Sequence, residues 1–276
     1  MPELPEVETV RCGLAPALEG HTLARVQMRR ADLRFPFPEG FGQRLTGKRV
    51  KRVGRRAKFL LIELDDETVL ISHLGMSGSF RIYEQDPPEL DKHDHVVFVT
   101  SQGTEIRYND PRRFGFMDLT TQSEMVDHPM LKKIGPEPIH PGLDGAALAT
   151  RLKDRAAPIK AALLDQSVIA GIGNIYACEA LFMAGISPRR KAGSVQGGRA
   201  VKLAEAIQQV LLEAIEAGGS SLKDHRQTSG ELGYFQHKFQ VYGRAGDSCS
   251  RCGPAVQIKQ INQSGRSTFF CSRCQR

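Results

Sequence analysis

The sequence has no run of about 18 consecutive apolar residues, the length that a membrane-spanning helix requires. Its first residues include acids where a signal peptide would carry basic residues followed by an apolar segment, which predicts a cytoplasmic protein. It also has no internal repeat and no low-complexity tract. These absences argue against membrane, secreted and repeat proteins and favour an ordinary globular chain.

Acidic residues are scarce at the C-terminal end of the chain. From Gln240 onward there are six basic residues and one acid, Asp247, so this tail contributes six minus one, or +5, of the formal net charge of +7. A basic protein with one strongly basic segment favours a polyanionic partner. The length of 276 residues exceeds the usual size of a single core and predicts about two domains.

Four of the six cysteines form two Cys-x2-Cys pairs separated by 18 residues near the C-terminus. Each pair can place two thiolates on one tetrahedral metal, and the spacing is typical of a structural zinc site. Disulfides and a redox Cys-x-x-Cys are the alternatives, but a cytoplasmic setting and the matching of the two pairs argue against them. The segment between the pairs alternates as a β-hairpin would, with Arg266 just past its turn. The predicted zinc ligands are Cys249, Cys252, Cys271 and Cys274.

The first 130 residues have the pattern of one helix followed by short strands. The helix is expected over residues 6–18, and the strands after it predict a β-sandwich or barrel-like domain. The expected strands cover residues 22–28, 49–53, 59–64, 69–73, 79–83, 96–100 and 105–108.

The second half of the chain changes to a helical period. Residues 129–138 are predicted to form a linker, and residues 224–237, which are polar and aperiodic, are predicted to form a mobile loop. We therefore expect a β-sandwich domain over residues 1–130, a helical domain over 139–225 and the cysteine module over 240–276. The expected helices cover residues 143–153, 160–169, 175–184 and 200–217.

The first residues of the chain allow two interpretations. Removal of Met1 would leave Pro2 as a free secondary amine beside the carboxylate of Glu3. An α-amino group titrates near pH 8, about two units below a lysine side chain, and is therefore a better nucleophile at pH 7. A simpler interpretation is that Pro5 and Glu6 only begin a helix, but the two are compatible because such a helix would present Pro2 and Glu3 ahead of it.

Four further segments each have a chemical and a structural interpretation. Asn174 follows a Gly-x-Gly turn, where a helix N-terminus can bind phosphate or the asparagine can simply cap the helix. Lys58 ends a basic cluster next to an apolar strand, so it is either solvated or turned inward as a catalytic amine. Met76, and Phe114 with Arg112 close by, lie in glycine-containing loops, as core residues or as wedges for a base stack.

Taken together, these segments resemble the bacterial formamidopyrimidine-DNA glycosylases over the whole chain. The resemblance is carried by PELPEVET, RRAKFLL, HLGMSG, KHDH, DPRRFG, GIGNIYACEALF and QVYGR, followed by the cysteine module. It implies an α+β multidomain fold: an N-terminal helix with a β-sandwich, then a helix–two-turn–helix domain with a C-terminal four-cysteine zinc-finger hairpin. It also implies a bifunctional DNA glycosylase/AP lyase of base excision repair that excises 8-oxoguanine and formamidopyrimidines.

The resemblance implies a role for each residue that matches a family motif. Pro2 would attack C1′ of the damaged nucleotide and form a Schiff base, with Glu3 as acid/base, and β,δ-elimination would cut the strand. Lys58 and Arg266 would act in the elimination steps and contact phosphate. Met76, Arg112 and Phe114 would fill the gap that the flipped nucleotide leaves. Further DNA contacts are implied for His93, Asn174, His73 and Lys160.

The resemblance also implies one structural zinc ion, double-stranded DNA with oxidised purines as the partner, and a monomer without membrane contact. The gap between the cysteine pairs is longer than is usual in the family, and we expect the added length toward the hairpin tip. Two other functions compete: a pyrimidine-specific relative of the endonuclease VIII kind, and a non-catalytic zinc-dependent DNA-binding protein. The Leu4-Pro5-Glu6 continuation and the long loop at residues 224–237 favour the oxidised-purine enzyme.

Overall fold

In the computed structural model, residues 2–220, 228 and 233–276 are described, and the chain divides into two compact units. The first unit comprises Met1–Lys132 and Ala217–Tyr234, and the second comprises Lys133–Glu216 and Phe235–Arg276. Within the described ranges, no helix has both the length and the apolar character needed to cross a membrane. The predicted loop at residues 224–237 falls mostly outside the described residues.

Helix α1 (Leu4–Leu18) opens the first unit and begins two residues before the predicted start. Pro5 occupies its first turn, where the missing N–H costs no hydrogen bond, and Glu3 is the N-cap residue. The helix buries one face completely, because Val7, Val10 and Leu14 are all 0% exposed. This burial holds the helix, and with it the N-terminal residues, in the core of the unit.

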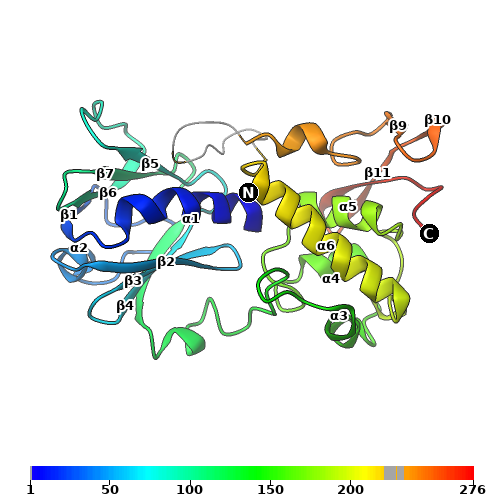
Figure 1. Ribbon diagram of the computed structural model, residues 1–276, viewed down its shortest axis with the longest axis horizontal. Coiled ribbons are helices and arrows are strands. Elements are labelled where there is room, and N and C mark those ends of the chain that lie inside the picture. Colours follow the sequence, from blue (N-terminus) through cyan, green and yellow to red (C-terminus); the bar gives the residue numbers. More distant parts are fainter. Residues whose placement is uncertain (1, 221–227, 229–232) are drawn as a thin grey trace. The chain divides into compact units, whose positions relative to one another are not determined.

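Two antiparallel four-stranded sheets enclose α1, as Figure 1 shows. One sheet has the strand order β1-β6-β7-β5 and the other β2-β3-β4-β8. Their apolar faces and α1 form one continuous core, which confirms the β-sandwich. The strands are β1 (Leu23–Met28), β2 (Val50–Arg56), β3 (Phe59–Leu64), β4 (Thr68–His73), β5 (Ser79–Tyr83), β6 (Asp94–Thr100), β7 (Glu105–Asn109) and β8 (Phe116–Thr121).

All seven predicted strands are present, whereas β8 and the short helix α2 (Phe41–Leu45) were not predicted. Strand β8 contains Asp118 and ends in two threonines, so its apolar pattern is weak in the sequence. Its pairing with the buried strand β4 over six residue pairs stabilises it as a strand. Tertiary hydrogen bonding here overrides a poor local signal.

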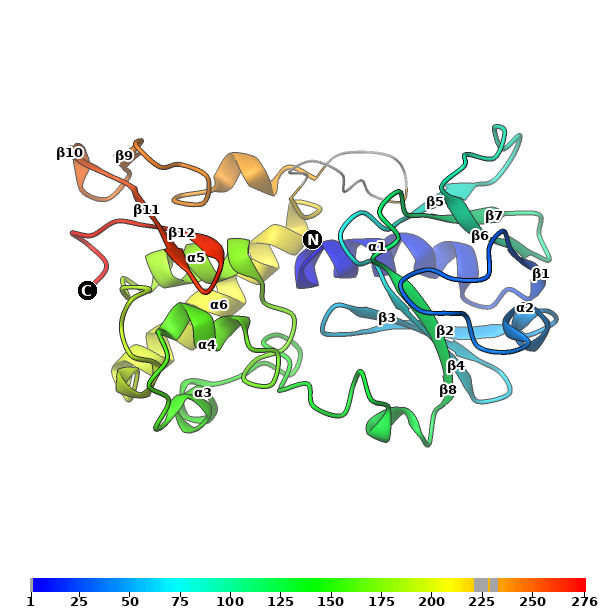
Figure 2. The same ribbon diagram turned by 180° about the vertical axis from the view of Figure 1, so that it is seen from behind.

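The second unit contains four helices, at the positions that the sequence predicts, and Figure 2 shows them beside the C-terminal hairpin. Helix α4 ends at Leu164 rather than at the predicted Ile169. It ends there because the Asp165 side chain accepts hydrogen bonds from the N–H and hydroxyl of Ser167 and folds the chain into a turn. The helices are α3 (Gly145–Leu152), α4 (Ile159–Leu164), α5 (Asn174–Met183) and α6 (Gly198–Glu216).

The cysteine module forms the predicted hairpin from β11 (Lys259–Gln263) and β12 (Arg266–Phe270), preceded by β9 (Ser248–Cys249) and β10 (Gly253–Gln257). Ser264 and Gly265 make a two-residue turn with φ of 50° and 73°, as the common type I′ hairpin requires. A two-residue turn is the shortest common hairpin connection. The hairpin packs on α5 of the same unit.

Candidate functional site

The N-terminal residues are buried and fixed ahead of α1. Pro2 is buried, and Glu3 is only 3% exposed. The backbone N–H of Glu3 donates to Oε2 of Glu6 at 2.8 Å, and the carbonyl of Glu3 accepts the N–H of Val7 at 3.1 Å. The helix therefore begins after Glu3, with Pro2 and Glu3 at its start, and this arrangement is compatible with both sequence interpretations.

Glu6 also anchors a segment that is distant in the sequence, a link that the sequence did not predict. Its second oxygen, Oε1, accepts the backbone N–H of Ser220 at 2.8 Å and the Ser220 hydroxyl at 2.9 Å. Close to Ser220 in the sequence, the carbonyl of Ala217 accepts the backbone N–H of Tyr234 at 3.0 Å. One buried carboxylate thus joins the start of α1 to Ser220, a residue 214 positions further along the chain.

Lys58 lies in the two-residue turn between β2 and β3, where Arg56 pairs with Phe59. Its side chain is buried, with 6% of the residue exposed, which agrees with the inward one of the two orientations that the sequence left open. Ala57 next to it has φ of 52° and so takes up the left-handed conformation that the tight turn needs. The rest of the basic cluster is partly structural, because Arg55 binds Glu8 of α1 at 2.8 Å.

His73 ends strand β4 and is a neutral side chain at pH 7. Burial, together with the positive charges of Lys58 and Arg34, lowers its pKa from 6.5 to about 4. Its Nδ1 accepts the N–H of Gly75 at 3.0 Å, which leaves the proton on Nε2. The ring stacks on Phe116 with centroids 5.4 Å apart. His73 can therefore donate one neutral hydrogen bond but does not supply a positive charge.

The depressed pKa of His73 predicts a loss of stability in acid. Unfolding restores the ordinary pKa of 6.5, so the unfolded chain takes up a proton that the folded chain refuses until about pH 4. The free energy of unfolding should fall between these two values by up to about 3 kcal/mol. Urea unfolding of the wild type at pH 6.5 and 4.5 should show this fall, and His73→Gln should flatten it. His21→Gln is the control, and an equal flattening there would contradict the assignment.

Met76, Arg112 and Phe114 share one exposed surface of the first unit. Met76 is 37% exposed and Phe114 is 44% exposed, so neither is the core residue of the structural interpretation. The Arg112 guanidinium lies over the Phe114 ring, 4.9 Å from its centroid. Arg112 and Phe114 line a hollow of about 470 Å³ together with Leu33, Arg34 and Arg113. Exposed apolar groups next to guanidinium groups suit contact with bases and phosphates.

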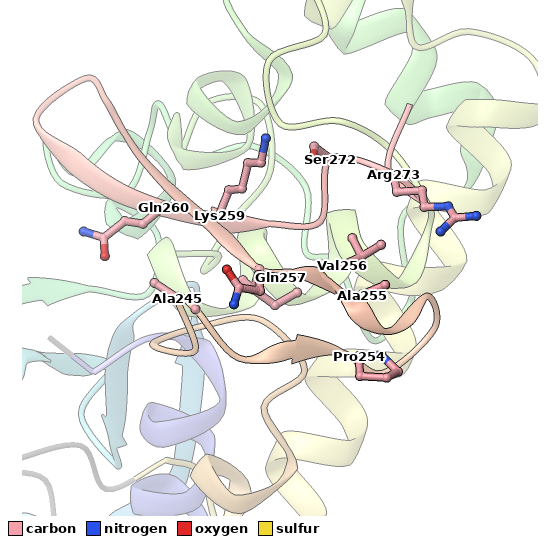
Figure 3. Close-up of a pocket in the computed structure, with 11 residues that line it drawn as sticks. Ala245, Pro254, Ala255, Val256, Gln257, Lys259, Gln260, Ser272 and Arg273 are labelled. Carbon is pink, nitrogen blue, oxygen red and sulfur yellow. The ribbon is translucent and has the colours of Figure 1, made fainter.

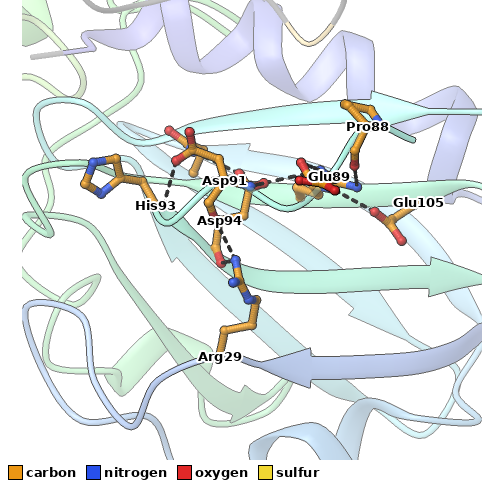
Figure 4. A network of polar contacts seen from close by, with 9 residues as sticks. Arg29, Pro88, Glu89, Asp91, His93, Asp94 and Glu105 are labelled. Atoms are coloured by element: carbon orange, nitrogen blue, oxygen red, sulfur yellow. Dashed lines mark hydrogen bonds and ion pairs between the residues drawn. The ribbon is translucent and has the colours of Figure 1, made fainter. Parts of the chain in front are cut away.

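His93 precedes β6 on a segment that a buried ionic network holds (Figure 4). Its backbone N–H donates to Oδ1 of Asp91 at 2.7 Å, while the Asp91 N–H donates to Oδ2 of Asp94 at 2.9 Å. Asp94 in turn accepts from Arg107 at 3.4 Å and from Asn109 at 2.8 Å. The imidazole is only partly buried, so the network fixes the backbone and leaves the side chain accessible.

In the second unit, Asn174 and Lys160 both bind the hairpin strand β12. Asn174 is the first residue of α5 and not its cap, and its Nδ2 donates to the Ser267 carbonyl at 2.9 Å. Lys160 is 0% exposed, and its Nζ donates to the same carbonyl at 3.0 Å and to the Thr268 hydroxyl at 2.7 Å. The fully buried ammonium group of Lys160 thus supports β12, the strand that begins with the exposed Arg266.

The four predicted zinc ligands lie together at one end of the hairpin. Their sulfur atoms all fall within 4.8 Å of one another, with Cys249 3.9 Å from Cys274 and Cys252 3.8 Å from Cys271. Four sulfurs around a tetrahedral zinc ion, at about 2.3 Å each, would be about 3.8 Å apart. Burial acts to raise the pKa of Cys271, but backbone N–H groups of Cys274 and Arg273 outweigh it and bring the pKa to about 7. The donor set therefore fits a structural zinc ion.

The segment between Cys252 and the hairpin forms the wall of a hollow of about 630 Å³, which Figure 3 shows. Residues 254–260 line it from one side and Ser272 and Arg273 from the other. Ile258 in this segment is buried in the small core that Cys178, Phe182 and Phe269 share with the cysteines. The module is thus held by apolar packing as well as by its four sulfurs.

Several residues with evident structural roles at these sites were not predicted from the sequence. Glu179 of α5 accepts three backbone N–H groups, from Gln240, Val241 and Tyr242, at 2.8–3.0 Å. Asp110 receives hydrogen bonds from two different loops. Their only signal in the sequence is an acid within an otherwise apolar or loop segment, which does not identify a partner.

Two protein-family models match the chain. The formamidopyrimidine-DNA glycosylase N-terminal domain matches residues 1–117, and the formamidopyrimidine-DNA glycosylase H2TH domain matches residues 134–226. Among curated proteins, the formamidopyrimidine-DNA glycosylase of Beijerinckia indica is 57% identical over 288 aligned positions, and that of Ruegeria pomeroyi is 54% identical over 283. In both comparisons 100% of each chain is covered.

Solved structures of a Lactococcus lactis protein are also similar along the whole chain. A mutant of this protein in complex with Fapy-dG-containing DNA matches with a TM-score of 0.90 and 36% identity, covering 100% of both chains. Its complexes with abasic-site DNA and with DNA containing an oxidised pyrimidine each match with a TM-score of 0.89 and 36% identity. The first of these covers 99% of both chains and the second covers 100%.

Proposed function

Because this chain belongs to the formamidopyrimidine-DNA glycosylase family, we propose that its buried Pro2-Glu3 start is the reactive centre of the enzyme. The protein is a DNA glycosylase/AP lyase that removes oxidised purines in base excision repair. The observation that supports Pro2 most directly is its position. α1 and Glu6 hold the N-terminal residues in a buried, dry setting, where a neutral amine is favoured over an ammonium group.

The chemistry starts when the Pro2 nitrogen attacks C1′ of the damaged nucleotide. The base leaves with the electron pair of its glycosidic bond and takes up the proton that the Pro2 nitrogen loses, and Glu3 protonates the sugar oxygen so that the ring opens. The resulting C1′ iminium is an electron sink that acidifies the C2′ proton. Loss of that proton breaks the C3′–O bond, and a second elimination breaks the C5′–O bond. Lys58 and Arg266 assist these steps by contact with the flanking phosphates, as charge-assisted donors.

The exposed set of Met76, Arg112 and Phe114, here called the gap-filling set, serves base extrusion. A nucleotide must leave the stack before its C1′ is reachable, and an empty gap costs a few kcal/mol. The apolar side chains of Met76 and Phe114 can occupy that gap. Arg112 can donate hydrogen bonds to the orphaned partner base and so favour cytosine, the partner of a damaged guanine.

The remaining candidates bind the phosphate backbone or support residues that do. His93 is held by its network with an accessible imidazole, and the α5 N-terminus at Asn174 offers backbone N–H groups. His73 donates as a neutral group. Lys160 acts through β12 rather than on the DNA itself. Zinc, held by the four cysteines, supplies only structure because all its positions are taken by thiolates.

The partner is double-stranded DNA that contains an oxidised purine, and the enzyme works as a monomer. The curated relatives are bacterial proteins. Because the substrate is DNA, we infer that the enzyme acts at the nucleoid in the cytoplasm. The basic charge of the hairpin module suits this polyanionic partner.

A panel of damaged duplexes tests the substrate class. We expect excision from 8-oxoguanine:cytosine and formamidopyrimidine:cytosine duplexes to exceed excision from thymine-glycol:adenine under single-turnover conditions. Arg112→Ala should reduce the preference for cytosine over adenine opposite 8-oxoguanine by about tenfold, the loss of one specific base contact. A preference for thymine glycol would instead identify an enzyme of the endonuclease VIII kind.

Arg266→Ala should weaken DNA binding and make the remaining affinity less sensitive to salt concentration. Removal of one phosphate contact is expected to lower the slope of log affinity against log salt concentration by about one. Fluorescence anisotropy with an abasic-analogue duplex, between 50 and 200 mM salt (roughly the range over which such contacts weaken), measures the slope. Zinc content should stay unchanged because the turn lies apart from the cysteines. An unchanged slope would remove Arg266 from the phosphate contacts.

A further inference from the structure

The buried carboxylate of Asp110 joins the two loops that carry the gap-filling set. We propose that Asp110 and Ser77 are positioning residues for base extrusion: they hold Met76 on one loop in a fixed relation to Arg112 and Phe114 on the other. This inference rests on the proposed function of the gap-filling set. It concerns how these exposed side chains are aimed, since they have little packing of their own to fix them.

The link between the loops runs through both oxygens of Asp110, which is 0% exposed. Oδ1 accepts the hydroxyl of Ser77 at 2.5 Å, and Oδ2 accepts the backbone N–H of Gly115 at 2.9 Å. The Ser77 oxygen also accepts the backbone N–H of Arg112 at 3.2 Å. This carboxylate and hydroxyl therefore join three points of the two loops: Ser77, which follows Met76, the backbone of Arg112, and Gly115, which follows Phe114.

Two glycines let the loops approach backbone to backbone. A Cβ on Gly75 would lie 2.3 Å from the N atom of Gly115, and a Cβ on Gly115 would lie 2.6 Å from the His73 carbonyl oxygen. Such distances allow no side chain at either position. The loops therefore fit together closely, and the polar link through Asp110 selects one relative arrangement.

The backbone of Asp110 extends the same framework to the DNA-contact candidate His93. Its N–H donates to the His93 carbonyl at 3.0 Å, and its carbonyl oxygen lies 2.9 Å from Nε2 of His95. Tyr108 adds a longer contact to the carboxylate at 3.4 Å, and burial together with Asp110 raises the pKa of its hydroxyl, which stays a donor. Both base-contacting loops and the His93 segment are thus anchored at one residue.

The positions of Met76 and Phe114 matter because a side chain can fill a gap in the base stack only if it lies at the level of the missing base. Met76 and Phe114 are 37% and 44% exposed, so their positions follow from the backbone that carries them. A displacement of about 1 Å at such a site can cost about 100-fold in rate. The cost should appear only where a gap must be filled, in duplex DNA. Reaction with an abasic site in single-stranded DNA needs no gap filling and serves as the reference reaction.

Ser77→Ala is the principal test, since it removes the link at the smallest change in volume. Asp110→Asn is the second variant, because its amide keeps a single acceptor oxygen and cannot accept from both the Ser77 hydroxyl and the Gly115 N–H. Ser72→Ala is the matched control: Ser72 is also 0% exposed, on strand β4, and its hydroxyl has no hydrogen-bond partner in the described part of the chain. Thermal unfolding of all three variants reports on the fold.

We expect Ser77→Ala and Asp110→Asn to slow single-turnover excision from an 8-oxoguanine:cytosine duplex by about 10- to 100-fold. Borohydride trapping on a single-stranded abasic oligonucleotide should stay close to the wild-type rate, and Ser72→Ala should match the wild type in both reactions. Fluorescence of a 2-aminopurine next to the lesion should show slower or incomplete gap filling in the first two variants only.

An equal loss on duplex and single-stranded substrates would show that the two residues only support the fold, and normal duplex excision by Ser77→Ala would show that the link is dispensable. Either result overturns the inference. Failure of the underlying function looks different: Met76→Ala and Phe114→Ala would then leave duplex excision unchanged. If these two variants are slow while Ser77→Ala is not, the gap-filling function stands and the inference about positioning fails.

Discussion

Protein that retains Met1, or that carries one extra residue before Pro2, is expected to form no borohydride-stable adduct with 8-oxoguanine or abasic-site DNA. An acylated proline nitrogen has no lone pair available for attack on C1′, so no iminium can form. Excision and strand cleavage should fall by about 10³-fold or more, as when a covalent nucleophile is removed from other enzymes. The measurement is single-turnover trapping, with intact mass spectrometry to determine the N-terminal residue of each preparation.

The helix itself provides the control for this experiment. α1 begins at Leu4, and the Glu3 N–H is bound to Glu6, so an added residue should leave the helix and the thermal unfolding temperature unchanged. If Pro2 and Glu3 served only to begin a helix, the extended protein would keep its activity. A persistent adduct would transfer the nucleophile to another amine, and the buried Lys58 would be the first to test.

Removal of zinc, by a chelator or by Cys271→Ser, is expected to lower affinity for damaged DNA by about 100-fold. Cys271 is 0% exposed and belongs to the small core that also contains Phe269 and Ile258. Loss of the metal should therefore release β12, the strand that begins with Arg266. Metal analysis should find about one zinc per wild-type chain, which is the capacity of a single four-thiolate site.

Two variants distinguish the metal from other thiol chemistry. Cys12→Ser should bind zinc and DNA normally, because Cys12 is exposed on α1 and is not in the four-sulfur cluster. Arg266→Ala should keep zinc but lose a phosphate contact, so the two effects separate. Full DNA affinity in zinc-free protein would show that the hairpin is not needed for binding.

The sequence alone predicted most of the local features of this chain because each has a short-range physical cause. The spacing of apolar residues predicted α1, seven strands and four helices, and the Cys-x2-Cys spacing predicted the four-cysteine zinc site. For Lys58, which directly precedes an apolar strand, the sequence left a solvated and an inward side chain open, and the structure shows it buried. By contrast, β8 was missed, and α4 was predicted too long, since pairing with β4 and the turn at Asp165 decide these cases.

Only the tertiary structure decided which distant residues act together. Lys160 and Ser267 lie 107 positions apart in the sequence, and Glu6 and Ser220 lie 214 apart, so neither hydrogen bond leaves a local pattern. The same holds for Asp110 and Ser77, where a buried carboxylate binds a hydroxyl of another loop. The residues that we propose to react with DNA or bind it are recognisable in the sequence by their chemistry. The residues that aim them are not, because their role depends on long-range hydrogen bonds that only the folded chain creates.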